Sequence, residues 1–172
     1  MSGEWLHRMD KDGLTPLDRA FRSGHMAITE LMLQQEREDK SGGLKGSSPL
    51  HRAASLGLTD AVNSLLSYGA RPTGRDHMGE IPLHKAAREG YAHAVEALLE
   101  VSDVNAVSSA GMTPLHWACL AGDPEIVRLL LRHGADRWLR NEAMDGLTPT
   151  DLAAVMGYEN ALDILGARPC FT

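Results

Sequence analysis

The chain has 172 residues, 43% of them hydrophobic, and a formal net charge of −6. This composition is typical of a folded globular protein and excludes a disordered chain. The acidic balance argues against nucleic acid or anionic membranes as partners, and no stretch approaches the roughly 20 apolar residues of a membrane span. We therefore expect a protein of the cytoplasm or the nucleus.

Five short helices are predicted, and each begins at a proline. The prolines recur at intervals of 33, 33, 32 and 35 residues, and a glycine follows each of them by eight residues. Proline suits the first turn of a helix, a preceding Thr or Ser caps it, and glycine suits the left-handed residue that ends it. Ile81 precedes the third proline and has no capping oxygen. The five prolines are Pro16, Pro49, Pro82, Pro114 and Pro149.

A second helix is predicted after each glycine, because apolar residues follow at spacings of three and four. In the fourth copy Asp123 and Pro124 have the types expected at the start of that helix. One helix pair cannot bury its own apolar stripe, so stability must come from stacking on the neighbouring pairs. The apolar positions include Ile28, Leu31 and Met32, then Val62 and Leu65, then Val95 and Leu98, then Ile126 and Leu130, and finally Leu162 and Leu165.

The copies read "DGLTPLDRAFRSGH", "GSSPLHRAASLGL", "GEIPLHKAAREGY", "GMTPLHWACLAGD" and "DGLTPTDLAAVMGY". A period near 33 with this frame resembles the ankyrin repeat family, from about Asp10 to Leu165. The resemblance implies an all-α solenoid of stacked helix-turn-helix pairs with hairpin-like loops. We expect one domain, 1–172, with repeats at about 10–42, 43–75, 76–107, 108–142 and 143–168. The first and last repeats are expected to be caps, because Asp18 and Asp151 replace the repeat histidine.

No catalytic, cofactor or metal site is predicted. His51, His84 and His116 are the repeat histidines, which in this family form hydrogen bonds between copies. The chain contains no GxSxG, GxxxxGK(S/T) or HExxH motif, and Cys119 stands in a small-residue slot where a buried, inert thiol is expected.

The residues three, six and seven positions after each proline share one face of the first helix. In the ankyrin family this face and the loop tips line a concave binding groove. The groove is predicted to have a basic half and an apolar half with Trp117 as its anchor. The basic half comprises Arg19, Arg22, Arg52, Lys85 and Arg88; the apolar half comprises Trp117, Leu120, Leu152, Val155 and Met156, with Met112 and Leu147 at the loop tips. In the alternative, Trp117 packs against its neighbouring copy or the tail 166–172 covers this apolar face. Trp138 is a weaker candidate, expected to cover the edge of the core.

The resemblance implies a non-enzymatic protein-interaction module, an adaptor or scaffold. We expect a monomer, and the two-part face predicts that it binds a protein segment or domain with acidic and apolar parts. A second hypothesis is a stoichiometric inhibitor or regulatory subunit of an enzyme or transcription factor, which would bury several loop tips. A third is a structural or targeting part of a larger assembly.

Overall fold

The computed structural model describes residues 8–12, 14–25, 28, 47–142 and 146–166. Within these residues all regular structure is helical, which confirms the predicted all-α class. The second helix predicted for the first copy, around Leu31 and Met32, lies outside the described residues. No helix of the described part is long and apolar enough to cross a membrane.

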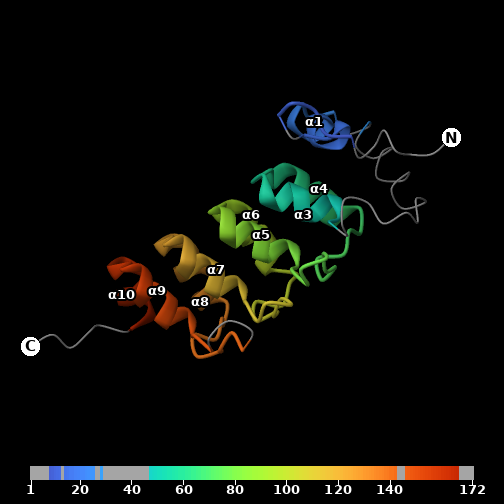
Figure 1. Cartoon of the computed structure of the whole chain (residues 1–172). Helices are drawn as coiled ribbons and strands as arrows, with labels where there is room; N and C mark the ends of the chain where they lie inside the picture. The colour runs from blue at the N-terminus through green and yellow to red at the C-terminus, as the bar shows by residue number, and fades with distance from the viewer. Residues whose placement is uncertain (1–7, 13, 26–27, 29–46, 143–145, 167–172) are drawn as a thin grey trace, which may run out of the picture.

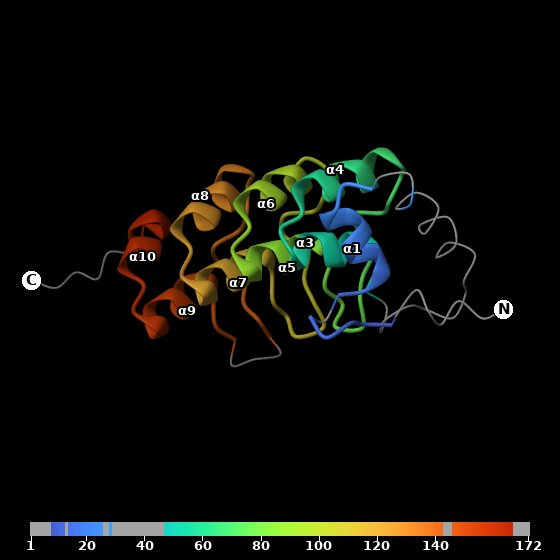
Figure 2. The same ribbon diagram turned by 90° about the horizontal axis from the view of Figure 1, so that it is seen from above.

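The helices form two parallel rows. Figure 2 shows the helices that begin at the repeat prolines in one row, the second helices in another, and the links between repeats projecting from the side of the first row. We call the first set the first-helix row. It contains α1 (Pro16–Arg22), α3 (Pro49–Ser55), α5 (Pro82–Glu89), α7 (Pro114–Ala121) and α9 (Pro149–Met156). The second row contains α4 (Thr59–Ser67), α6 (Ala92–Leu99), α8 (Pro124–Arg132) and α10 (Glu159–Leu165).

The helix ends follow the residue types that predict them. The side chains of Ser48, Thr113 and Thr148 each accept a hydrogen bond from a backbone N–H of the first turn, whereas Ile81 makes no such cap. At the other end, Gly122 and Gly157 are left-handed, both with φ of 73°. Each helix of the first row is therefore limited to about two turns.

The core runs along the stack between the two rows. The leucine after each of the first four prolines is buried, and so are the inward positions of the second helices. Cys119 is fully buried in the slot that Ala87 fills in the preceding repeat, and burial raises the pKa of its thiol to about 12. This thiol stays protonated at neutral pH, as expected of an inert core cysteine.

Two tyrosines lock neighbouring repeats together at a glycine. A Cβ atom at Gly57 would lie 2.4 Å from the ring of Tyr91, and one at Gly122 would lie 2.6 Å from the ring of Tyr158. Each tyrosine precedes the second helix of the following repeat. Two separate reasons thus require glycine at these positions: the backbone is left-handed, and the tyrosine ring occupies the space that a Cβ atom would need.

Candidate partner-binding face

The repeat histidines join successive repeats, in the role that the family resemblance implies. The Nε2 atom of His51 lies 2.9 Å from the carbonyl oxygen of Glu80, and His84 reaches Met112 in the same way at 3.1 Å. His116 reaches the carbonyl oxygen of Leu147 at 3.2 Å. These three hydrogen bonds hold the links between repeats against the first-helix row.

Each histidine is also committed at its other nitrogen. The Nδ1 atoms of His84 and His116 accept hydrogen bonds from the backbone N–H groups of Ile81 and Thr113. Nε2 therefore carries the proton and donates to the next repeat. Burial lowers the pKa of His51 and His116, and lowers that of His84 to about 4. No group of metal-ligating side chains occurs among the described residues.

Asp18 joins the first two repeats differently. Its side chain is buried and accepts hydrogen bonds from the backbone N–H and the hydroxyl of Thr15, at 2.8 and 2.9 Å. Arg52 of the next repeat donates to Asp18 through Nη2 at 2.7 Å and Nε at 3.2 Å. This first interface depends on an ion pair. The carboxylate of Asp18 is buried between the two repeats.

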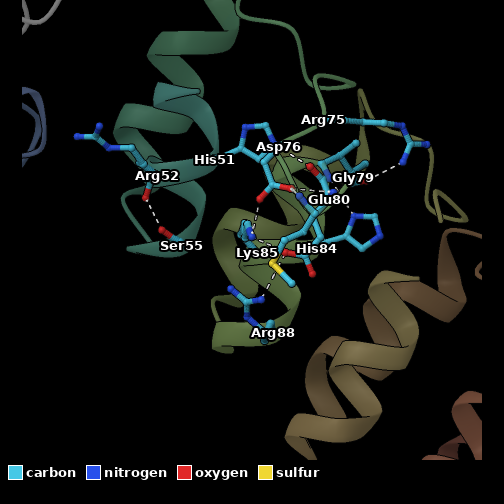
Figure 3. Close-up of polar contacts among 12 residues, drawn as sticks. His51, Arg52, Ser55, Arg75, Asp76, Gly79, Glu80, His84, Lys85 and Arg88 are labelled. Atoms are coloured by element: carbon cyan, nitrogen blue, oxygen red, sulfur yellow. Dashed lines mark hydrogen bonds and ion pairs between the residues drawn. The ribbon is translucent and has the colours of Figure 1, made fainter. Parts of the chain in front are cut away.

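A buried ionic cluster occupies the third repeat. The Nζ atom of Lys85 lies 2.7 Å from Oδ2 of Asp76 and also contacts Oε2 of Glu80. The backbone N–H groups of Met78 and Glu80 donate to the carboxylate of Asp76. Burial alone would raise the pKa of Asp76, but the bond from Lys85 and these two backbone bonds together hold it below its ordinary value. Figure 3 shows Lys85 and Arg88 pointing from α5 toward the two carboxylates of the preceding link.

The cations of the predicted basic half are therefore largely neutralised inside the protein. Lys85 was expected on the exposed face, and this is wrong: the residue is 8% exposed, because its flexible chain turns back onto Asp76 and Glu80. Arg52 pairs with Asp18, and Arg88 pairs with Glu80 and Glu89. Arg19 is exposed but pairs with Asp10 and Asp12, and Arg22 is exposed.

The apolar half is more open at its end than at its centre. Val155 and Met156 are 74% and 45% exposed, whereas Trp117, Leu120 and Leu152 are half-buried. We call these five residues the apolar face. The expected exposure of Met112 at a loop tip is wrong, because the residue is 2% exposed and receives the side-chain N–H of Asn141 at its sulfur.

Arg88 covers part of Trp117. Its guanidinium carbon lies 5.2 Å from the centroid of the indole ring, within the range of a cation–π contact. The indole Nε1 is buried and has no hydrogen-bond partner. Trp117 thus packs locally against the preceding repeat, as the alternative expected, while part of its side chain stays exposed. The tail 167–172, which the same alternative placed over this face, lies outside the described residues.

The side chain of Trp138 is exposed on its link and does not lie against the core. Trp138 was expected to cover the edge of the core, and this is wrong, because the residue is 72% exposed. Its backbone N–H donates to Oδ1 of Asp136 at 2.8 Å, and this turn leaves Leu139, not Trp138, half-buried. Val107 is also exposed in the preceding link.

The chain matches a family model described as ankyrin repeats, over residues 3–76, 50–141 and 83–170. It is 32% identical over 120 residues to ankyrin repeat and SOCS box protein 11 of Danio rerio, covering 69% of this chain and 40% of that protein. It is 41% identical over 107 residues to protein phosphatase 1 regulatory subunit 27 of Homo sapiens, covering 62% and 47%. It is 33% identical over 159 residues to the human transient receptor potential cation channel subfamily A member 1, covering 91% and 11%.

The chain spans less than half the length of each of these relatives. The matched segments nevertheless run through all five proline-glycine copies, and the helix pairs stack as the repeat requires. Repeats of this family form protein-interaction modules that are generally not catalytic. The chain belongs to the ankyrin repeat family.

Proposed function

We propose that this chain binds a protein partner through the apolar face formed by α7 and α9. The observation that carries the proposal is the exposure of Val155 and Met156 beside the half-buried Trp117 and Leu120. Contiguous exposed apolar side chains on a folded protein mark interaction sites, and Trp is enriched at the centres of such sites. The partner is a segment or domain that presents apolar side chains.

Charge contributes less to this binding than the sequence alone suggests. Arg52, Lys85 and Arg88 already make ion pairs within the chain, so an acidic partner would have to compete with Asp18, Asp76 and Glu80. Surface electrostatics act chiefly on the association rate and its salt dependence. We therefore expect affinity at the apolar face to depend weakly on salt.

The proposal is tested with two matched substitutions, Val155→Ser and Val101→Ser. Both valines are exposed, at 74% and 46%, and Val101 follows α6, away from the apolar face. Partners captured from a lysate by the wild type are identified by mass spectrometry, and their affinities are then measured by calorimetry. Val155→Ser should weaken binding about tenfold while Val101→Ser leaves it unchanged. Equal binding of both variants would reject the apolar face.

A second candidate is a regulatory subunit of an enzyme. The observation in its favour is the 41% identity to a protein named as a regulatory subunit of protein phosphatase 1. Such a subunit would contact its enzyme through several loop tips as well as the apolar face. Hydrogen exchange on the complex separates the two: protection at residues 77–79 and 109–111 favours this candidate, and protection confined to α7 and α9 favours the first.

A further inference from the structure

A second surface lies on the links between repeats, where two arginines are exposed and make no ion pair with a carboxylate in the described part of the chain. Arg75, Val107 and Arg140 hold equivalent positions in three successive links. Arg75 and Val107 lie six residues before the capping position of the next helix, and Arg140 lies eight residues before it. Trp138 lies two residues before Arg140. We call these four residues the loop ladder.

Hydrogen bonds between the links hold the loop ladder in register. Nη1 of Arg75 donates to the carbonyl oxygen of Val107 at 2.6 Å, so the first link is joined to the second. Asn105 joins the second link to the third, since its Nδ2 donates to the carbonyl oxygen of Gly134 at 3.2 Å and its Oδ1 accepts from the N–H of Asp136 at 2.8 Å. The ladder is therefore preorganised.

The two arginines of the ladder differ from the cations of the first-helix row. Nη1 of Arg75 also donates to the carbonyl oxygen of Gly79 at 2.7 Å, and Nη1 of Arg140 donates to that of Gly146 at 2.9 Å. Among the described residues neither arginine makes an ion pair with a carboxylate. Figure 3 shows the guanidinium of Arg75 directed away from the buried cluster of Asp76, Glu80 and Lys85. Both charges are exposed and held in place.

The apolar component of the ladder is unusually open. Trp138 is 72% exposed and Val107 is 43% exposed, and the carboxylate of Asp136 fixes the turn that presents the indole. Trp and Arg are among the residues most enriched at the hot spots of protein interfaces. Anchored guanidinium groups lose little freedom when they bind a carboxylate.

We propose that the loop ladder binds an acidic protein segment that places an apolar side chain against Trp138. Carboxylates of the segment would pair with Arg75 and Arg140, which make no ion pair with a carboxylate among the described residues. A protein segment is favoured over nucleic acid, because the ladder offers two arginines and two apolar side chains, whereas affinity for nucleic acid comes mainly from many phosphate contacts. This site is separate from the apolar face and does not depend on it.

The test uses a fluorescein-labelled peptide of about 12 residues, enough to span roughly 40 Å when extended. Leu occupies its two central positions and Glu all others; a matched peptide carries Lys in place of Glu. Fluorescence anisotropy is measured with the full chain. We expect the Glu peptide to bind at least about tenfold tighter than the Lys peptide, with an affinity that falls at high salt.

Two double variants distinguish the effect of the ladder arginines on peptide binding from the effect of the chain's net charge. Arg75→Gln with Arg140→Gln should remove the preference for Glu, whereas Arg128→Gln with Arg132→Gln, an equal change of charge on exposed positions of α8, should retain it. Trp138→Ala should lower the affinity for the Glu peptide about tenfold. Val155→Ser should leave this binding unchanged, so failure of the apolar face and failure of the ladder are distinguishable.

Three results would overturn the proposal. The first is no measurable binding of the Glu peptide, and the second is equal loss of binding in both double variants. The third is displacement of the Glu peptide by a single-stranded oligothymidine, which would assign the site to nucleic acid. Urea unfolding of each variant confirms that it remains folded before its binding is compared.

Discussion

The guanidinium carbon of Arg88 lies 5.2 Å from the centroid of the Trp117 ring, and this contact joins α5 to α7. Arg88 also lies 3.4 Å from Glu80 through Nη1. The buried ionic cluster of the third repeat is therefore connected to the apolar face of the fourth. The ion pair with Glu80 holds the Arg88 guanidinium in place, and the guanidinium in turn packs against one face of the Trp117 ring.

This contact should contribute to stability as a coupling between the two residues. In a double-mutant cycle of Arg88→Gln and Trp117→Leu, we expect a coupling free energy of about 0.5 to 1 kcal/mol, the range of a partly exposed cation–π pair. Urea unfolding of the four proteins measures it. A parallel cycle of Arg88→Gln with Val101→Ser should give a coupling near zero, and similar values in both cycles would contradict the contact.

The tyrosine-glycine contact gives a prediction with an internal control. Gly122 and Gly157 have the same backbone angles, φ of 73° and ψ of 24°. A Cβ atom at Gly122 would lie 2.6 Å from the Tyr158 ring, whereas a Cβ atom at Gly157 would have no neighbouring atom within 4 Å. Both alanine substitutions incur the cost of left-handed backbone, about 1 kcal/mol, but Gly122→Ala should lower the free energy of unfolding by about 1 to 3 kcal/mol more.

The steric part of that difference is tested by adding Tyr158→Leu. A smaller side chain at 158 should reduce the extra loss caused by Gly122→Ala while leaving the effect of Gly157→Ala unchanged. If both glycine substitutions lower the free energy of unfolding equally in the wild-type background, the ring does not occupy the space above Gly122.

Acid should destabilise the chain as the pH falls below 6.5, through its buried histidines. Burial lowers the pKa of His84 from 6.5 to about 4, so the unfolded chain takes up a proton in this range and the folded chain does not. The contribution of neutral His84 to the free energy of unfolding is therefore fully present above pH 6.5, and it is lost as the pH falls toward 4. The difference between these values corresponds to roughly 3 kcal/mol for His84. His51 and His116 act in the same direction.

Urea unfolding between pH 7 and pH 4.5 measures this loss. His84→Asn should be less stable at pH 7 but should show a smaller dependence on pH. Val101→Ser changes an exposed residue that carries no titratable group, and it should leave the pH dependence unchanged. An unaltered slope in His84→Asn would show that the buried imidazole is not the titrating group.

Lys85→Met should be among the most damaging single substitutions on the first-helix row. It leaves the buried carboxylates of Asp76 and Glu80 without their ammonium partner, and breaking a buried pair from one side costs about 3 to 5 kcal/mol. Adding Asp76→Asn and Glu80→Gln should recover most of this loss. The free energies of unfolding of the three proteins are compared by urea titration, and a single variant as stable as the triple would argue against the buried cluster.

The repeat frame is highly informative about backbone structure. The proline, the capping hydroxyl and the glycine act locally, so the beginnings and ends of α7 and α9 follow from neighbouring residues in the sequence. The missing cap at Ile81 is also confirmed, and the sequence pattern alone did not show that Nδ1 of His84 accepts the Ile81 N–H group.

The site was harder to predict, because helix positions define where a side chain starts and not where a long one ends. Lys85 begins on the exposed side of α5 and turns back to a residue five positions earlier. The paired position does carry a signal: Glu80 and Lys85 of the third repeat correspond to Met112 and Trp117 of the fourth. Both positions are charged in the third repeat and both are apolar in the fourth.

The direction of the links between repeats limits how the repeats can be reordered. Interior histidines donate forward to the next loop, whereas Asp18 accepts backward from Arg52 of the second repeat. If the third repeat followed the first directly, Lys85 would stand in the place of Arg52 while already committed to Asp76 and Glu80. The first repeat is therefore not interchangeable with the others, and shuffled or shortened arrays built from this chain need the first two repeats kept together.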